Sequence, residues 1–212
     1  SRLSRRLRER GMDSFGAYLD SLAGDHDPEW QEFINCLTTN LTSFFREDHH
    51  FSALVDDLRT RSGPGPVRIW CSAASTGEEP YSIAITVVEA LGSAAQVRIV
   101  ASDIDTKVLT TAQRGVYDAD ARGLSPERMH RHFLRGKGSN AGFMRVKPDL
   151  AKLIEFRPFN LMSRQWTGSG GLGEPFDVIF CRNVMIYFDA PTQRQVLQQM
   201  HAVLKPGGLL YV

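Results

Sequence analysis

The sequence predicts an α/β protein with a doubly wound, mostly parallel sheet of the Rossmann-like kind. Two short β-branched segments, "VRIWCS" at 67–72 and "VRIVAS" at 97–102, have the continuous apolar character of buried parallel strands. A helix-like run, "EEPYSIAITVVEALG", lies between them, and strand and helix continue to alternate toward the end of the chain. Such alternation is typical of parallel strands joined by crossover helices.

Three amphipathic helices are predicted before the first strand. "SRLSRRLRERG" places Leu3 and Leu7 one helical turn apart among arginines. The second helix, in "DSFGAYLDSLAG", is expected to be capped by Asp13, and the third, in "PEWQEFINCLTT", to begin at Pro28. Together these segments indicate an N-terminal helical lobe.

We expect this lobe to span 1–61, followed by a linker at 62–66 and the sheet domain at 67–212. The "SGPGP" run supports the linker because glycine and proline break both helix and sheet. The segment 131–152 carries "FMRV" among glycines and belongs to a stretch that is too long for an ordinary α/β connection. We therefore expect a small antiparallel β insert there. Neither end of the sequence has a cap or turn signal, so both domains are expected to be incomplete at their outer ends.

The remaining elements continue the alternation after the second strand. A helix is predicted at 105–114, strands at 153–158 and 176–181, a helix at 191–204, and a last apolar strand in "GGLLYV" at 207–212. This order is the one that a doubly wound sheet requires.

The composition excludes several classes of protein. A net charge of +1 over 212 residues gives no broad attraction to nucleic acid. Cys36, Cys71 and Cys181 lie far apart without the spacing of a zinc site, so we expect neither a metal site nor a disulfide, and a reducing, cytoplasmic location. No apolar run approaches the ~20 residues that cross a bilayer, so no membrane insertion is expected.

The turn after the first strand, "SAASTGEEP" at 72–80, is the first candidate site. In a doubly wound sheet, ligands bind beyond the carboxyl ends of the strands, where small side chains let them approach the backbone. The turn lacks the glycine and lysine patterns of phosphate-binding loops. Its carboxylates, Glu78 and Glu79, disfavour a pyrophosphate and favour a positively charged ligand, such as the sulfonium and ammonium of S-adenosylmethionine (SAM).

Asp103 lies just past the second predicted strand. An acid at this position can accept hydrogen bonds from both ribose hydroxyls of an adenosyl group. The alternative is that Asp103 serves as an N-cap for the helix that follows. The first interpretation supports the same ligand as the acidic turn.

Four segments together resemble the CheR family of bacterial chemotaxis receptor methyltransferases. They are "LTTNLTSFFREDHHF" (37–51), "AASTGEEPYSIAI" (73–85), "ASDID" (101–105) and "FDVIFCRNVMIYFD" (176–189). The resemblance extends through nearly all of the chain. It implies a class I SAM-dependent methyltransferase fold and transfer of a methyl group from SAM to glutamate side chains on the cytoplasmic helices of chemoreceptors. The enzyme would be a protein-glutamate O-methyltransferase, with S-adenosylhomocysteine as its second product.

The resemblance also implies the residues of the site. Arg46 and Tyr187 would hold the substrate glutamate, the first by a forked guanidinium contact and the second by a phenol hydrogen bond. For Tyr187 the alternative is an aromatic residue of the core. His49 and His50 are expected to pack or to face solvent. The family's cofactor pocket falls on Asn40, Thr42, Arg46, Ala73, Glu78, Asp103, Asn160, Leu161, Cys181 and Arg182.

The implied partner is a chemoreceptor. In this family the basic first helix faces the receptor's acidic methylation region, although a run of charges is more generally a solvated face. In some members the β insert binds a C-terminal receptor pentapeptide by adding it as a strand to a sheet edge. A hairpin without a ligand is the alternative for the insert, and we expect a monomer.

Other functions fit the sequence less well. A nucleic-acid amino-methyltransferase would be expected to carry an (N/D)PP(Y/F) loop where "RNVMIYF" stands. A nicotinamide dehydrogenase would carry a glycine fingerprint. The alternative from another class is a regulatory or scaffold protein that binds SAM or S-adenosylhomocysteine without turnover.

Overall fold

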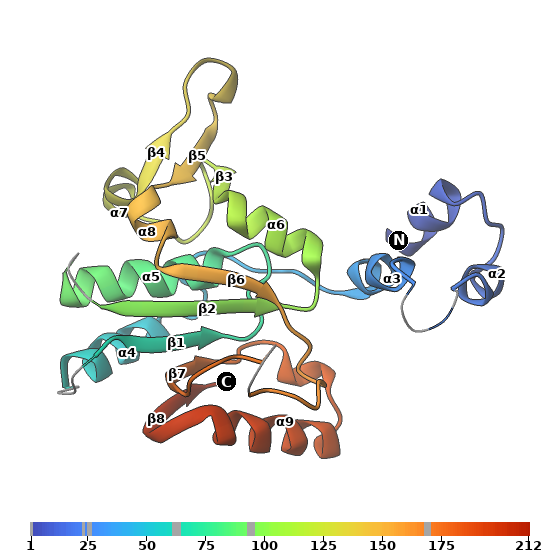
Figure 1. Ribbon diagram of the computed structural model, residues 1–212. Helices are drawn as coiled ribbons and strands as arrows, with labels where there is room; N and C mark the ends of the chain where they lie inside the picture. The colour runs from blue at the N-terminus through green and yellow to red at the C-terminus, as the bar shows by residue number, and fades with distance from the viewer. Residues whose placement is uncertain (1, 23, 25–26, 61–64, 93–95, 168–170) are drawn as a thin grey trace.

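The computed structural model describes residues 2–22, 24, 27–60, 65–92, 96–167 and 171–212. Its centre is a five-stranded sheet of order β6-β2-β1-β7-β8, in which every neighbouring pair is parallel (Figure 1). The strands are β1 (Val67–Cys71), β2 (Val97–Asp103), β6 (Ile154–Pro158), β7 (Phe176–Phe180) and β8 (Leu204–Tyr211). The predicted doubly wound parallel sheet is therefore confirmed.

Helices cover both faces of this sheet. On one face lie α4 (His49–Thr60) and α5 (Glu78–Leu91), which contribute to the larger hydrophobic cluster. On the other face lies α9 (Ala190–Val203), which contributes to the second cluster. α6 (Thr106–Arg114) runs beside β2 and β6. The sheet is thus buried on both sides, which explains its continuous apolar strands.

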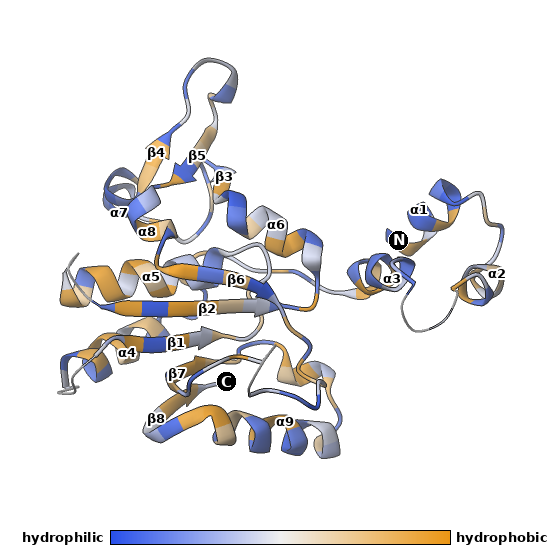
Figure 2. Ribbon diagram, in the orientation of Figure 1, coloured by the Kyte–Doolittle hydropathy of each residue, from blue (hydrophilic) through white to orange (hydrophobic). Residues whose placement is uncertain are grey.

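The alternation of side chains along β1 shows how the two clusters form. Ile69 and Cys71 point into the cluster with α4 and α5, whereas Trp70 between them points into the cluster with α9. Figure 2 shows hydrophobic residues along the strands of the sheet and a mostly hydrophilic α1. The two faces of one strand therefore fix helices from distant parts of the chain.

The first three helices form a small cluster of their own, set to one side of the sheet (Figure 1). They are α1 (Arg2–Glu9), α2 (Phe15–Asp20) and α3 (Glu29–Leu37). Their cluster buries Leu7 and Tyr18. The group contacts the sheet domain through α3, whose Gln31 donates from Nε2 to the Ile104 carbonyl at 2.8 Å.

A buried carboxylate holds this small lobe together. Glu29 accepts hydrogen bonds from Arg6 Nε at 2.7 Å and Arg6 Nη2 at 2.5 Å. The Tyr18 hydroxyl donates to the same carboxylate at 2.7 Å. Because a small lobe buries little apolar surface, this charged network is a main link between α1, α2 and α3.

Two local predictions for these helices need correction. α2 is capped by Ser14, whose Oγ accepts from the Ala17 amide at 3.1 Å, so the prediction of Asp13 as cap is wrong. The expected lobe of 1–61 also includes α4, which buries Phe51 and Leu54 in the core of the sheet domain. The predicted linker at 62–66 lies mostly outside the described residues.

A second, three-stranded antiparallel sheet of order β3-β5-β4 stands at one edge of the domain (Figure 1). Its strands are β3 (Val116–Asp118), β4 (Phe133–Arg135) and β5 (Phe143–Val146). The predicted antiparallel insert is confirmed by β4 and β5, while β3 comes from before the expected range and is too short to show a strand pattern. Short helices, α7 (Pro126–His132) and α8 (Pro148–Ala151), flank this sheet. Within the described residues, no helix is long and apolar enough to cross a membrane.

Candidate functional site

A cleft of about 530 Å³ opens at the carboxyl ends of the parallel strands. It lies around β1, where the strand order reverses between β2 on one side and β7 on the other. This switch point is where doubly wound sheets bind their ligands. The volume falls within the ~300–1,000 Å³ that is usual for small-molecule sites.

Most of the predicted site residues meet in this cleft. The residues from the predicted set that line it are Asn40, Thr42, Arg46, Ala73, Asp103, Asn160, Leu161, Arg182 and Tyr187. They come from the α3–α4 connection, from the end of β2 and from the loops after β1, β6 and β7. Segments far apart in the sequence are therefore brought to one place by the parallel sheet.

Two predicted residues do not line the cleft. The carboxylate of Glu78 accepts a hydrogen bond from Thr76 Oγ1 at 2.6 Å, within the turn itself. Burial raises the pKa of Glu78. Cys181 is fully buried in the hydrophobic cluster that includes α9, and burial raises the pKa of its thiol to about 11. Glu78 and Cys181 thus support the walls of the site in this structure.

Asp103 is held rigidly at the end of β2. Its Oδ2 accepts from the Ser75 amide at 2.8 Å, and its Oδ1 accepts from the Asp105 amide at 2.9 Å. Burial raises the pKa of Asp103 against the effect of these backbone hydrogen bonds. A carboxylate has about four lone-pair positions, so Asp103 can still accept a hydrogen bond from a hydroxyl group of a ligand.

Asp105, not Asp103, is the N-cap of α6. Its Oδ1 accepts from the amides of Lys107 at 2.9 Å and Val108 at 3.2 Å. Its Oδ2 accepts from Thr38 Oγ1 at 2.6 Å and Asn40 Nδ2 at 2.9 Å. The same side chain therefore caps a helix and fastens the α3–α4 connection beside the cleft. The alternative of Asp103 as a helix cap is ruled out.

The turn after β1 is shaped by backbone conformation. Ser75 has a φ of 47°, in the left-handed region, and its amide reaches Asp103 in that conformation. Its Oγ donates to the Asn40 carbonyl at 3.2 Å. The turn is therefore fastened to both neighbouring walls of the cleft.

A buried ion pair closes the other side of the cleft. Arg182 Nη1 lies 2.7 Å from Glu79 Oε2, and the two side chains are only 1% and 13% exposed. Arg182 Nη2 donates to the Arg46 carbonyl at 2.5 Å. Burial raises the pKa of Glu79, and the guanidinium of Arg182 opposes that rise. Glu79 stands in the same motif as Glu78 and lines the cleft, although it is not among the predicted site residues.

The two residues expected to hold the substrate lie at the mouth of the cleft. Arg46 Nη1 donates to the Leu41 carbonyl at 2.9 Å, and about a third of its side chain is exposed. Tyr187 belongs to the 3₁₀ turn Met185–Tyr187 and is 60% exposed. The alternative of Tyr187 as a core aromatic is therefore wrong.

Large hydrophobic side chains are exposed around this mouth. Leu37, Leu41 and Met162 line the cleft and are exposed, and Ile186 is exposed next to Tyr187. Clusters of exposed apolar side chains often mark a surface that meets another macromolecule. The site can therefore hold a small ligand with hydroxyl and cationic groups while its rim contacts a larger one.

Comparison with known proteins agrees with this geometry. The family described as "CheR methyltransferase, SAM binding domain" matches residues 40–212, and "CheR methyltransferase, all-alpha domain" matches residues 1–38. The boundary between these two matches lies before α4, which accords with the packing of that helix on the sheet.

Curated relatives match along the whole chain. A "Chemotaxis protein methyltransferase" of Klebsiella aerogenes is 54% identical over 100% of this chain and 72% of its own length. The Escherichia coli protein of the same name is 51% identical over 100% of this chain and 73% of its own length. "Chemotaxis protein methyltransferase 2" of Pseudomonas aeruginosa is 54% identical over 100% of this chain and 75% of its own length. The chain belongs to the CheR methyltransferase family.

Proposed function

We propose that the protein transfers the methyl group of SAM to glutamate side chains of chemoreceptors and so forms glutamate methyl esters. The relatives are named chemotaxis protein methyltransferases, and the family match covers its SAM-binding domain. The single observation that carries the proposal is the cleft at the switch point of the sheet, with the fixed carboxylate of Asp103 at its edge. The proposed setting is the cytoplasm and the proposed state a monomer.

The residues in the cleft suit the chemical groups of SAM. Asp103 would accept hydrogen bonds from the ribose hydroxyls, because the backbone amides do not use all the lone pairs of its carboxylate. Phe159 and Leu161 supply apolar surface for the adenine ring. Glu79 and Arg182 provide paired charges near the place where an amino acid group would lie. When bound, SAM supplies an electrophilic methyl group on a cationic sulfur.

The methyl transfer requires no proton transfer by a side chain of the protein. A glutamate with an ordinary pKa near ~4.3 is already ionised at neutral pH, so no general base is required. The protein's contribution is to hold the carboxylate in line with the methyl group, which is worth up to about 7–11 kcal/mol in well-oriented systems.

Arg46 and Tyr187 are the proposed holders of the substrate carboxylate. Both line the mouth of the cleft, where a side chain from a receptor helix would enter. A guanidinium can bind a carboxylate by two hydrogen bonds, and a phenol can add a third. A strong Arg46 contact would stabilise the negative charge of the nucleophile, so we assign Arg46 an orienting role.

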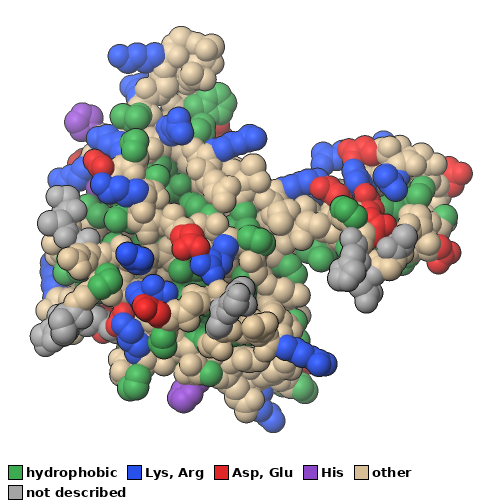
Figure 3. All heavy atoms as spheres, in the orientation of Figure 1, with side chains coloured by type: hydrophobic (Ala, Val, Ile, Leu, Met, Phe, Trp, Pro, Cys, Tyr) green, Lys and Arg blue, Asp and Glu red, His purple; other side chains and the backbone are tan. Residues whose placement is uncertain are grey.

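The surface of the protein that binds the receptor is proposed to include α1. Arg6 is hydrogen-bonded to Glu29 inside the lobe, and Arg5 Nε lies 3.5 Å from Glu9 Oε1. On the side of this lobe that Figure 3 shows, basic and acidic side chains are interspersed. Arg2, Arg8 and Arg10 remain exposed on the lobe, and we propose that they contact the acidic methylation region.

The small antiparallel sheet is the proposed site for the C-terminal receptor pentapeptide. β4 is an edge strand, because β5 is its only neighbour in the described sheet order. Leu134 is exposed on that strand. An extended peptide could pair with its backbone groups and place an apolar side chain beside Leu134.

A methyl-transfer assay tests the proposed function. Receptor-containing membranes and radiolabelled SAM are incubated with the protein, and labelled receptor is then treated with mild base. Glutamate methyl esters release volatile labelled methanol, so the proposal predicts base-labile, protein-dependent label on the receptor. Binding of S-adenosylhomocysteine without any labelled receptor would instead support the regulatory or scaffold alternative.

A further inference from the structure

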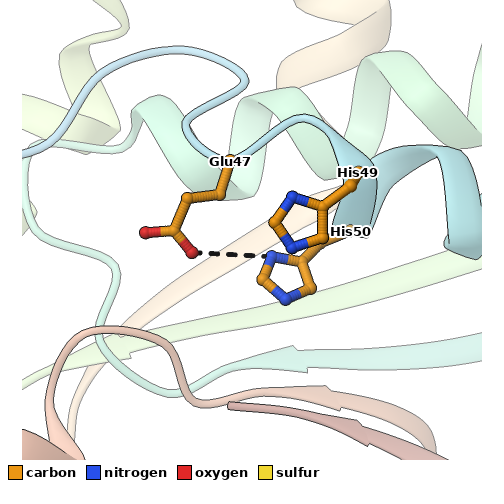
Figure 4. A group of neighbouring side chains, drawn as sticks. All are labelled: Glu47, His49 and His50. Carbon is orange, nitrogen blue, oxygen red and sulfur yellow. Dashed lines mark ion pairs between the residues drawn. The ribbon is translucent and has the colours of Figure 1, made fainter.

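Three side chains with metal-binding groups meet at the start of α4, outside the cofactor cleft. Glu47, His49 and His50 each place one ligand atom within 4.8 Å of the others. The two imidazole rings lie side by side with centroids 4.1 Å apart, and the carboxylate of Glu47 faces them (Figure 4). We refer to these three residues as the Glu-His-His cluster. From the sequence, the two histidines are expected only to pack or to face solvent.

The imidazole of His50 has an unused nitrogen inside this cluster. Its Nδ1 is buried and has no hydrogen-bond partner among the described residues. It lies 3.8 Å from Glu47 Oε2, which is too long for a hydrogen bond. Buried polar atoms are normally satisfied, so this nitrogen requires an explanation.

We propose that the Glu-His-His cluster binds a borderline divalent cation, for which Zn²⁺ is the reference ion. Two imidazole nitrogens and one carboxylate oxygen are a common ligand set for zinc, whereas Mg²⁺ and Ca²⁺ select oxygen ligands. Zinc–ligand bonds of ~2.0–2.2 Å place ligand atoms no more than about 4 Å apart, slightly closer than in this structure. Glu47 and His49 are exposed, so rotation of their side chains can close that gap.

The cluster is linked to the cofactor cleft through Glu47. Its Oε2 lies 3.2 Å from Arg182 Nη2, and its Oε1 accepts from Asn183 Nδ2 at 3.2 Å. Arg182 and Asn183 both line the cleft. A cation at the cluster would compete with Arg182 for this carboxylate and would repel its guanidinium. Metal binding therefore weakens the contact between Glu47 and Arg182.

The arrangement of the cluster determines how tightly it binds zinc and how bound zinc affects the cleft. The site has only three protein ligands and a competing guanidinium, so it binds zinc less tightly than a closed four-ligand structural site. Occupation of the site lowers the affinity of the cleft for S-adenosylhomocysteine. This effect rests on the proposed function, whereas metal binding itself does not.

Calorimetric titration of the purified chain with ZnCl₂ tests the site. Wild type is expected to bind one Zn²⁺, and His49→Ala is expected to weaken binding by about ten-fold or more. Two matched controls should bind like wild type: His201→Ala removes an exposed imidazole of α9, and Cys36→Ser removes the one free thiol in the described chain that is not buried. Zinc affinity that is the same in His49→Ala and wild type, or lost in Cys36→Ser, would overturn the proposal.

Absorption spectra of the Co²⁺-loaded protein provide a second measurement that does not depend on heats of binding. Visible d–d bands without sulfur-to-cobalt charge transfer are expected in wild type and should be lost in His49→Ala. Thiolate charge-transfer bands would place the metal at a cysteine and contradict the site. Melting curves show whether His49→Ala, a change at an exposed residue, keeps the fold.

The coupling is tested by titrating S-adenosylhomocysteine with and without saturating Zn²⁺. Zinc should weaken this binding in wild type and leave it unchanged in His49→Ala. If zinc binds but does not change the affinity for S-adenosylhomocysteine, the coupling is wrong. A protein that binds zinc as predicted but never binds S-adenosylhomocysteine would count against the proposed function and not against the metal site.

Discussion

Arg182 and Glu79 form a buried ion pair that joins the loop after β7 to the first turn of α5, with Nη1 and Oε2 2.7 Å apart. The two residues are 103 positions apart in the sequence. Arg182 also donates to the Arg46 carbonyl and so reaches the third wall of the cleft. One side chain thus connects the three segments that surround the proposed position of the methyl donor.

Removing one partner of this pair should destabilise the protein. Arg182→Ala leaves Glu79 buried without a counter-charge, and the free energy of unfolding is expected to fall by about 3–5 kcal/mol in urea titrations. The control Lys152→Ala breaks an exposed pair with Asp149 and should change stability by less than ~1 kcal/mol. Equal effects of the two substitutions would show that the buried pair has no special role.

Asp103 should be decisive for binding of the cofactor product. Asp103→Asn replaces one carboxylate oxygen by an amide donor, so affinity for S-adenosylhomocysteine is expected to fall by about ten-fold to a hundred-fold. Asp149→Asn, at an exposed acid of α8, is the matched control and should bind like wild type. Calorimetry measures both. An unchanged affinity in a folded Asp103→Asn variant would remove Asp103 from the cofactor site.

Tyr187 should affect turnover more than cofactor binding. Tyr187→Phe keeps the exposed ring but removes the hydroxyl, and the initial rate of receptor methylation is expected to fall by about ten-fold at saturating SAM. The affinity for S-adenosylhomocysteine should stay within about two-fold of wild type, because one hydrogen bond to the substrate does not touch the cofactor. Arg194→Ala on the exposed face of α9 is the control for surface changes. A Tyr187→Phe variant with the wild-type rate would exclude the proposed contact.

The N-terminal lobe should lose stability in acid through Glu29. Hydrogen bonds from Arg6 lower the pKa of Glu29 from 4.5 to about 2, against the effect of burial, and the Tyr18 hydroxyl adds to the lowering. Between these two values the unfolded chain binds more protons than the folded one, so this contribution to stability is complete above 4.5 and disappears as the pH falls toward about 2. Urea titrations at several pH values should show a shallower loss in Glu29→Gln. Glu174→Gln, at an exposed carboxylate, should keep the wild-type profile, and a Glu29→Gln profile identical to wild type would contradict the assignment.

Gly77, which precedes α5, should tolerate no side chain. Its φ is 101°, and a Cβ would lie 2.6 Å from the Tyr117 hydroxyl and 2.8 Å from Ala112 Cβ. Gly142 has a similar φ of 92° but has nothing within 4 Å. Gly142→Ala should therefore lower the free energy of unfolding only by the backbone penalty of about 1–2 kcal/mol. Gly77→Ala should lower it by about 1–3 kcal/mol more. Urea unfolding compares the two, and equal losses would mean that the turn can move aside.

Much of the fold follows from local sequence patterns. The strands are apolar on both faces because helices cover both sides, so "VRIWC" and "FDVIF" are visible as strands without knowledge of their partners. The packing of α4 could not be read in this way, because its periodicity marks a buried face but not the surface it covers. β3 has three residues and shows no period at all.

The site was predictable where it depends on position along a strand. Asp103 is the last residue of β2, and the carboxyl ends of parallel strands meet at one edge, so its place in the cleft follows from the order of elements. The distinction between Asp103 in the lining of the cleft and Asp105 as helix cap depends on backbone angles that two acids in one short segment do not reveal. The pairing of Glu79 with Arg182 is a tertiary contact without a local signal.

The central claim is that the carboxylate at the end of β2 receives the sugar of the methyl donor. A crystal structure with S-adenosylhomocysteine tests it most directly. The account predicts the ligand in the cleft around β1, with its ribose hydroxyls on the Asp103 carboxylate. A ligand bound elsewhere, or one whose ribose makes no contact with Asp103, would contradict it.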